Sequence, residues 1–96
     1  MKSLVEIKSI LAQYKEYLYQ KYPIRSLAIF GSYSRNEQQE GSDVDLLVEF
    51  NGRVGIRFID LANELEVLLQ QKVDLVSAKG IKHRYLRVIK PDLIYV

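Results

Sequence analysis

Two aspartates separated by one residue, Asp43 and Asp45, stand inside a run of residues that otherwise favours a strand. Side chains two positions apart on a strand project from the same face, about 6.5–7 Å apart at their Cα atoms. Both carboxylates can therefore bind one ion. Aspartate is disfavoured in strands, yet Asp74 repeats this anomaly between Val73 and Leu75. We expect Asp74 to join the pair if its strand lies beside theirs.

Three convergent carboxylates repel one another unless a cation neutralises them. Ligands that are all oxygen suit the hard cations Mg²⁺ and Mn²⁺, so Asp43, Asp45 and Asp74 are candidate metal ligands. Without a metal, at least one of the three carboxyl groups must have a raised pKa. The alternative is that each aspartate is only a solvent-facing residue of an amphipathic strand or a turn.

Gly31 and Ser32 directly follow a short apolar stretch that ends at Phe30. Glycine permits close backbone approach, serine can cap a following helix, and free N–H groups at such a turn attract anions. Beside a carboxylate-bound cation, this turn would hold the phosphates of a nucleotide. Gly-Ser alone is a common turn, so the indication lies in its combination with the Asp43 and Asp45 pair.

The apolar spacing predicts the elements that must position these residues. Prolines at positions 23 and 91 are expected to end helical patterns. Residues 34–42 contain no apolar side chain and favour a short helical turn followed by an exposed loop. We expect helices over residues 3–21, 58–71 and 81–89, strands over 26–30, 43–50 and 72–76, and an edge strand or docking tail over 93–96. This order predicts an α/β or α+β sandwich, with one sheet and helices on one face.

Length and composition narrow the class of protein. The 96 residues suit one domain, and 48% hydrophobic with 27% charged residues is typical of a soluble globular chain. The chain has no cysteine and one histidine, His83, which excludes disulfides, thiolate metal sites and a His-rich zinc cluster. No segment resembles a signal peptide or a membrane helix, so we expect a cytoplasmic protein.

The net charge is only +2, but its distribution is uneven. Residues 37–74 hold nine acids against three bases, whereas the segments on either side are basic. This pattern is compatible with binding a polyanion through bridging cations, and equally with scattered surface charge.

The motif residues resemble a known family. Phe30-Gly31-Ser32 followed by Asp43-Val44-Asp45-Leu46 is similar to the signature of the DNA polymerase β-like nucleotidyltransferase superfamily, a hydrophobic residue with Gly-Ser and then Asp-hydrophobic-Asp. The resemblance is closest to its smallest members, the minimal nucleotidyltransferase (MNT) domains, which include the MntA-type antitoxins. It extends over nearly the whole chain, so residues 1–96 are expected to form a single domain of this kind.

The resemblance implies a small mixed sheet flanked by helices and a metal-dependent transfer of AMP from ATP to a hydroxyl. Asp43 and Asp45 would bind metal, and Asp74 would be the third ligand and the general base. Gly31 and Ser32 would hold the triphosphate, with Arg35 nearby. Two Mg²⁺ ions are implied, with Mn²⁺ as a possible substitute.

The resemblance also implies a partner, because 96 residues leave no separate domain to bind an acceptor. In the MNT family this partner is a HEPN-domain toxin whose tyrosine receives AMP, which silences its RNase activity. A hetero-oligomer is therefore expected, with neither a membrane nor direct nucleic-acid binding. The first helix and a basic segment are candidate docking faces, although core packing and a solvated surface explain them equally well. That segment contains Lys79, Lys82, His83, Arg84, Arg87 and Lys90.

Two other functions stay open at this point. The chain could be a non-catalytic antitoxin that neutralises a HEPN RNase by covering its active site. It could also transfer nucleotides to a small molecule or an RNA end, although it has no long basic and aromatic groove for RNA.

Overall fold

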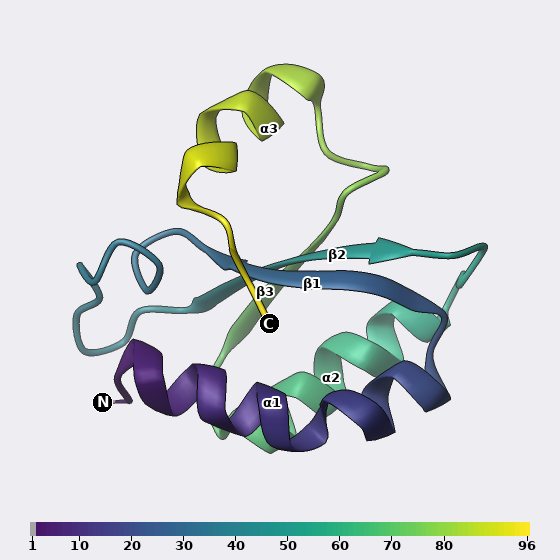
Figure 1. Ribbon diagram of the computed structural model, residues 1–96, viewed down its shortest axis with the longest axis horizontal. Coiled ribbons are helices and arrows are strands. Elements are labelled where there is room, and N and C mark those ends of the chain that lie inside the picture. Colours follow the sequence, from purple (N-terminus) through teal and green to yellow (C-terminus); the bar gives the residue numbers. More distant parts are fainter. Residues whose placement is uncertain (1) are drawn as a thin grey trace.

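A computed structural model describes residues 2–96 and arranges them around one four-stranded sheet (Figure 1). The elements in chain order are α1 (Leu4–Lys21), β1 (Ile24–Phe30), β2 (Val44–Phe50), α2 (Arg57–Leu69), β3 (Val73–Ser77), α3 (His83–Ile89), a 3₁₀ turn (Lys90–Asp92) and β4 (Ile94–Tyr95). In these residues no helix is both long and apolar enough to cross a membrane.

The sheet is mixed, as expected, with strand order β3-β2-β1-β4. β1 pairs antiparallel with β2 and with β4, whereas β2 and β3 run parallel. A parallel pair needs a long crossover connection, and α2 supplies it. The parallel pairing makes β3 the direct neighbour of β2, which is the arrangement that the carboxylate prediction requires.

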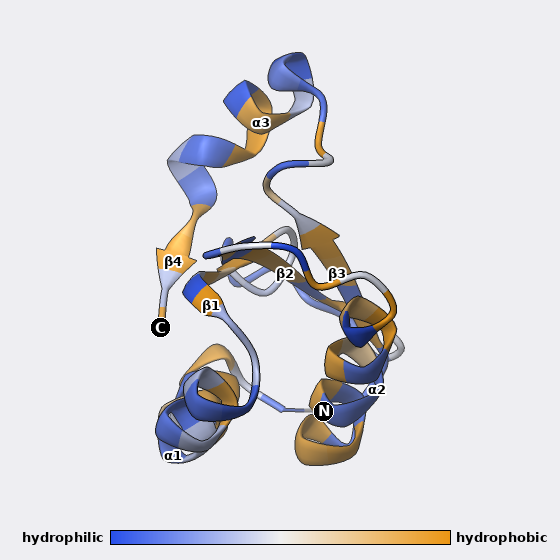
Figure 2. Ribbon diagram, turned by 90° about the vertical axis from the view of Figure 1, so that its right-hand side faces the viewer, coloured by the Kyte–Doolittle hydropathy of each residue, from blue (hydrophilic) through white to orange (hydrophobic). Residues whose placement is uncertain are grey.

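The helices lie on both faces of the sheet, so the expectation that all helices share one face was wrong. α1 and α2 cover one face, and α3 stands on the other (Figures 1 and 2). Figure 2 shows hydrophobic residues along β2 and β3, between these layers. The alternation in β2 explains the two layers, because Val44, Leu46 and Val48 belong to the main core while Leu47 packs with Phe30 and Ile89 beneath α3.

α1 begins with a capping box. The backbone N–H of Glu6 donates to Ser3 Oγ and the Glu6 carboxylate accepts from the Ser3 N–H, both at 3.1 Å, so two otherwise unpaired donors are satisfied. The buried stripe contains Ile7, Leu11 and Leu18. The helix ends at Lys21, ahead of Pro23, as the sequence predicts.

Some other boundaries differ from the predicted ones by one or two residues, whereas β1, β2 and α3 end at residues 30, 50 and 89 as predicted. β1 begins at Ile24 rather than at residue 26, α2 ends at Leu69 rather than near residue 71, and α3 begins at His83 rather than at residue 81. Helix α2 ends early because Gln70 adopts the left-handed conformation, with a φ of 51°. The C-terminal edge strand forms, but only over Ile94–Tyr95.

A polar cluster around Glu64 joins α1 to α2. The Glu64 carboxylate accepts hydrogen bonds from the hydroxyls of Tyr17 and Tyr22, the latter at 2.8 Å, and pairs with Lys21 Nζ at 3.1 Å. Burial alone would raise the pKa of Glu64, but the hydrogen bonds from Tyr17, Tyr22 and Lys21 outweigh it and hold the pKa below its usual value. Ionised Glu64 therefore stabilises the contact between the helices.

We expect Glu64→Gln to lower the free energy of unfolding by about 1 kcal/mol at pH 7, because it weakens charge-assisted hydrogen bonds. Since the folded-state pKa lies below the unfolded one, the loss should shrink as pH falls through that range. Urea unfolding at pH 7 and pH 3 measures both effects. Glu16→Gln, an exposed site on α1, is the control, and an equal loss there would contradict this account.

Candidate active site

The parallel pairing of β2 and β3 brings the predicted carboxylates together. Asp45 and Asp74 are direct register partners, so their side chains project from the same face of the sheet. Asp43 lies immediately before β2, close enough for its charge to act on Asp45. The Val44 N–H donates to Lys72 O at 2.9 Å, which fixes the entries of both strands.

Asp45 is the least exposed of the three aspartates. Its side chain is half-buried, whereas Asp43 and Asp74 are exposed. Burial first, and then the charges of Asp74 and Asp43, raise the pKa of Asp45 to about 6, against a smaller opposing effect of Arg35. This agrees with the expectation that one carboxylate has a raised pKa when no cation is bound. Asp45 therefore lies in a field of negative charge that a bound cation would offset.

The three carboxylates are not already arranged as a closed metal cage. Across residues 2–96, no group of three Asp, Glu or His side chains is close enough to hold an ion. The donor set still fits a hard cation, because it consists of carboxylate oxygens around one half-buried acid. The exposed side chains of Asp43 and Asp74 would have to move to complete it.

Gly31 is required by its contact with Asp45. A Cβ atom at this position would lie 2.1 Å from Asp45 Oδ2, and the backbone has a φ of +75° that disfavours other residues. The missing side chain lets the turn after β1 lie directly against the carboxylate. The two motifs recognised in the sequence thus touch each other in the structure.

The turn after Gly31 is not a helix, so the expected capping role of Ser32 was wrong. Residues 31–36 form hydrogen-bonded turns, in which Ser34 Oγ donates to Gly31 O at 2.9 Å and the Glu37 N–H donates to Ser32 O at 2.8 Å. Ser32 therefore contributes a backbone carbonyl to closing the loop. Its hydroxyl remains a candidate phosphate ligand.

Arg35 lies close enough to Asp45 for its positive charge to oppose the rise in the pKa of that carboxyl group, and two acids hold the Arg35 side chain. Arg35 Nε pairs with Glu37 Oε1 at 2.8 Å, and its Nη1 pairs with Asp92 Oδ2 at 3.3 Å. Asp92 could not be identified from the sequence, because 57 residues separate it from Arg35 and no local pattern marks it. It ties the 3₁₀ turn after α3 to the loop that follows Gly31.

Tyr33 and Gln71 were also missed from the sequence. Tyr33 is fully buried in the main core, and its hydroxyl contacts Gln71 Nε2, which also donates to Ser42 O at 3.3 Å. Gln71 therefore links the loop carrying Gly31 to the entry of the strand carrying Asp45. A part-buried polar contact of this kind has no signature in a single sequence.

A cavity of about 510 Å³ opens beside Asp43, at the end of the sheet where α1 begins. This volume is in the range of small-ligand sites, but of the three aspartates only Asp43 contributes to the wall. The lining residues are Lys2, Glu6, Glu40, Gly41, Ser42, Asp43, Gln70, Gln71 and Lys72.

The contact between Gly31 and Asp45 predicts the effect of adding one methyl group. Gly31→Ala should cost about 1–3 kcal/mol more in unfolding free energy than Gly41→Ala, because it adds a clash to the backbone strain. Gly41 is the matched control, since its φ is +89° and a Cβ added there would meet nothing within 4 Å. Equal losses in urea unfolding would show that the contact with Asp45 is unimportant.

The raised pKa of Asp45 predicts that replacing this acid with a neutral residue increases the free energy of unfolding, by an amount that depends on pH. Ionising Asp45 costs more in the folded than in the unfolded chain, so the cost appears above about pH 4 and is complete above about pH 6. In chelator, Asp45→Asn should therefore stabilise the protein at pH 8, by on the order of 1–3 kcal/mol, and have little effect at pH 4.

Thermal unfolding at the two pH values measures this difference. Glu49→Gln, at an exposed acid on the same face of β2, is the control variant. A gain for Asp45→Asn that is the same at pH 4 and pH 8 would contradict the assignment.

Comparison with known proteins identifies the family to which this chain belongs. Residues 11–96 match the family model of the nucleotidyltransferase domain. A Methanocaldococcus jannaschii protein named as a candidate protein adenylyltransferase is 50% identical over 98 residues, covering 100% of both chains. The protein adenylyltransferase MntA of Thermococcus cleftensis is 39% identical over 97 residues, covering 100% of this chain and 98% of that one.

Solved structures agree with these relatives. A structure described as a minimal nucleotidyltransferase superposes with a TM-score of 0.75 at 32% identity, covering 92% of this chain and 93% of that one. A Shewanella oneidensis complex of a tri-AMPylated HEPN toxin with its MNT antitoxin matches with a TM-score of 0.70 at 21% identity, over 93% of this chain and 70% of that one, which shows the shared fold. The chain belongs to the nucleotidyltransferase domain family, as a minimal nucleotidyltransferase of the MntA-type protein adenylyltransferases.

Proposed function

We propose that this protein transfers AMP from ATP to a tyrosine hydroxyl of a HEPN-domain toxin and thereby acts as its antitoxin. The observation that carries the proposal is the register pairing of Asp45 with Asp74, with Gly31 packed against Asp45. This geometry places metal-binding acids beside a turn whose backbone a ligand can approach closely. A triphosphate with bound metal needs both features. The names of the relatives support the choice of AMP and of a protein acceptor.

In the proposed reaction the tyrosine oxygen forms a bond to the α-phosphorus of ATP, and the bond from that phosphorus to the bridging oxygen breaks. Pyrophosphate leaves with the bonding electrons. Asp74 accepts the hydroxyl proton, a role that suits an exposed carboxylate at the edge strand β3. The backbone of Gly31 and Ser32 and the guanidinium of Arg35 bind the phosphates.

Asp43, Asp45 and Asp74 are the proposed ligands of magnesium, with two ions expected and manganese as a substitute. When bound, the metal supplies positive charge to the phosphates and to the departing pyrophosphate. Asp45 contributes a carboxylate that the protein has already desolvated and surrounded with negative charge. A cation at this position removes that repulsion, so binding should favour the ionised form of Asp45.

The acceptor comes from a partner, because the described residues form one sheet with its helices and no second unit. We propose that residues 1–96 act as one minimal catalytic domain whose substrate surface is completed by the toxin. The donor ATP is a cytoplasmic metabolite, which favours that compartment.

The proposal is tested by incubating the purified protein with α-labelled ATP, Mg²⁺ and a purified HEPN-domain toxin encoded beside it. We expect label on a toxin tyrosine, identified by mass spectrometry. Asp43→Asn and Asp45→Asn should each lower the rate by at least about 100-fold, and Asp74→Asn by about 100- to 10,000-fold as expected for a lost general base. Asp60→Asn, at an exposed acid on α2, should retain the wild-type rate.

Protection of cells from the toxin separates catalysis from simple binding. If Asp43→Asn/Asp45→Asn protects as well as the wild type, the protein neutralises by complex formation and the transferase proposal fails. Label on a small molecule, with none on the toxin, would instead identify a different acceptor.

A further inference from the structure

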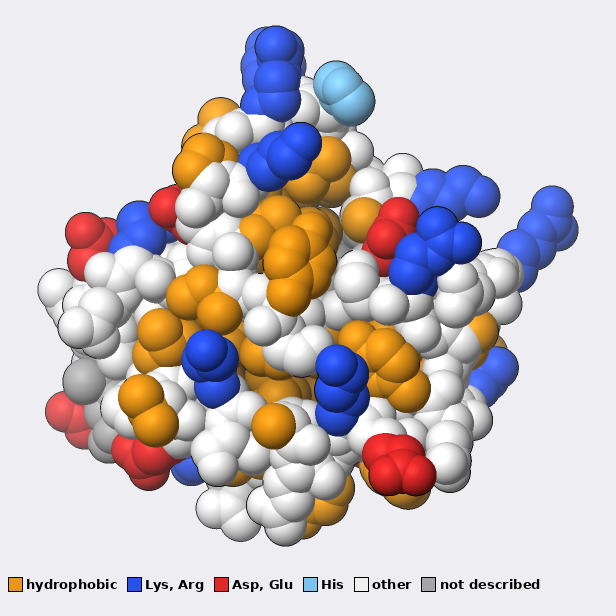
Figure 3. Space-filling model, viewed as in Figure 1, with side chains coloured by type: hydrophobic (Ala, Val, Ile, Leu, Met, Phe, Trp, Pro, Cys, Tyr) orange, Lys and Arg blue, Asp and Glu red, His pale blue; other side chains and the backbone are white. Residues whose placement is uncertain are grey.

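The surface of α3 that faces away from the sheet carries an unbalanced positive charge. Between Leu75 and Pro91 there is no acidic residue, and the ion pairs found among residues 2–96 involve no lysine or arginine of this stretch. Figure 3 shows basic side chains over α3, with the only histidine beside them. The five exposed cations are Lys79, Lys82, Arg84, Arg87 and Lys90.

Apolar side chains lie among these cations. Tyr85 is 50% exposed and Val88 is 66% exposed, and their spacing of three residues makes them neighbours on the helix surface. Together with Lys82 and Arg84 they line a hollow of about 400 Å³. We call these four residues the α3 outer surface. An apolar centre with a charged rim is the usual composition of a protein interface.

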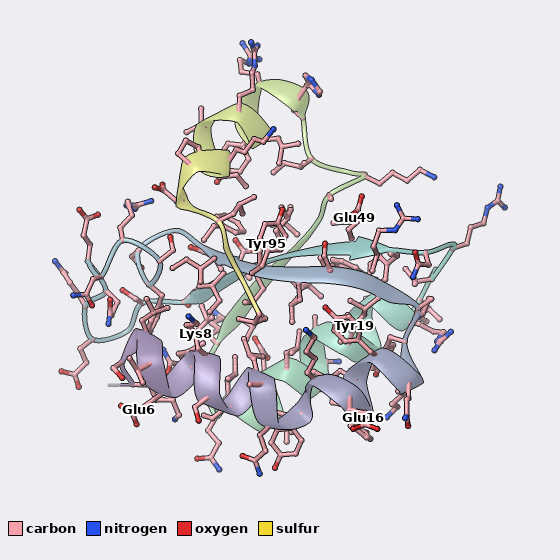
Figure 4. All side chains as sticks on the ribbon, viewed as in Figure 1. Glu6, Lys8, Glu16, Tyr19, Glu49 and Tyr95 are labelled. Carbon is pink, nitrogen blue, oxygen red and sulfur yellow. The ribbon has the colours of Figure 1, made fainter. Side chains whose placement is uncertain are left out.

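The α3 outer surface is connected to the catalytic loop through the opposite side of the same helix. Ile89 packs against Phe30, whose next residue is Gly31, and the turn after α3 carries Asp92, which holds Arg35. A protein bound to α3 would therefore lie on the face of the sheet to which Asp45 belongs. Figure 4 shows that Tyr95 and Glu49 lie below α3 on this face of the sheet, on the far side from α1.

We propose that the α3 outer surface docks an acidic surface of the acceptor protein, which places an apolar side chain in the hollow between Tyr85 and Val88. This inference rests on the proposed function and adds the binding site for its protein substrate. Charge favours an acidic occupant, since complementary potentials steer association and disfavour basic partners. A protein fits better than RNA, because single-stranded RNA requires a series of stacking rings and this surface provides only Tyr85.

The test is charge reversal at two exposed positions. For Lys82→Glu/Arg84→Glu we expect the KM for the HEPN acceptor to rise at least about tenfold, with the KM for ATP and the kcat at saturating acceptor unchanged. Val88→Asp should raise the acceptor KM in the same way, because it places a charge in the hollow. Lys8→Glu/Lys15→Glu, which makes the same change in charge on exposed positions of α1, should leave every parameter at its wild-type value.

Binding measured without catalysis separates this inference from the proposed function. In titration calorimetry of the two proteins without ATP, we expect the charge reversal to weaken the Kd at least about tenfold and the control to have no effect. If the wild type transfers no AMP but this difference in Kd is found, the proposed function fails and the docking site stands.

Two results would overturn the docking site itself. One is an unchanged acceptor KM and Kd for both α3 variants. The other is loss of binding to a fluorescein-labelled single-stranded RNA in the charge-reversal variant with the acceptor KM unchanged, which would assign the surface to nucleic acid. Circular dichroism and thermal unfolding check that each variant is folded, as expected for substitutions at exposed positions.

Discussion

Repulsion between carboxylates at one end of the sheet is the constraint on which the rest of this structure depends. Asp45 is half-buried between two other acids, a placement that costs free energy unless a cation is present. The fold must therefore hold the Asp45 carboxylate in place against the repulsion from Asp43 and Asp74. Two features do so: the parallel register of β2 with β3 fixes Asp74 opposite Asp45, and Gly31 packs directly against the Asp45 carboxylate from the end of β1.

Packing on the opposite face of the sheet and hydrogen bonds between the loops stabilise this arrangement of the acids. The main core beneath α1 and α2 buries one face of β2, so the strand cannot slip by one residue without exposing its apolar side chains. Gln71 connects the two loops that meet at the site. Glu66 accepts the Val73 N–H at 3.0 Å and fixes the start of β3, one residue before Asp74.

The sequence predicts the parts of this site that depend on local periodicity. Strand alternation places Asp43 and Asp45 on one face, and the apolar spacing predicts α1 and the three longer strands. The sequence alone does not predict the contacts that depend on tertiary geometry. No local pattern could indicate the packing of Gly31 against Asp45, the ion pair of Arg35 with Asp92, or the placement of α3 opposite α1 and α2. The sequence does not indicate the last point, because Leu47 alternates with Asp45 and Glu49 on a half-polar face of the strand, yet it belongs to a second small core.

The crossover from β2 through α2 to β3 has a consequence for how the protein folds. Asp45 and Asp74 approach each other only when α2 has packed and the parallel strands have paired, which is a non-local step. Their repulsion opposes that step in particular, whereas β1 and β2 can pair beforehand as neighbours in the chain. The folding step that pairs these two strands is therefore also the one that brings Asp74 beside Asp45.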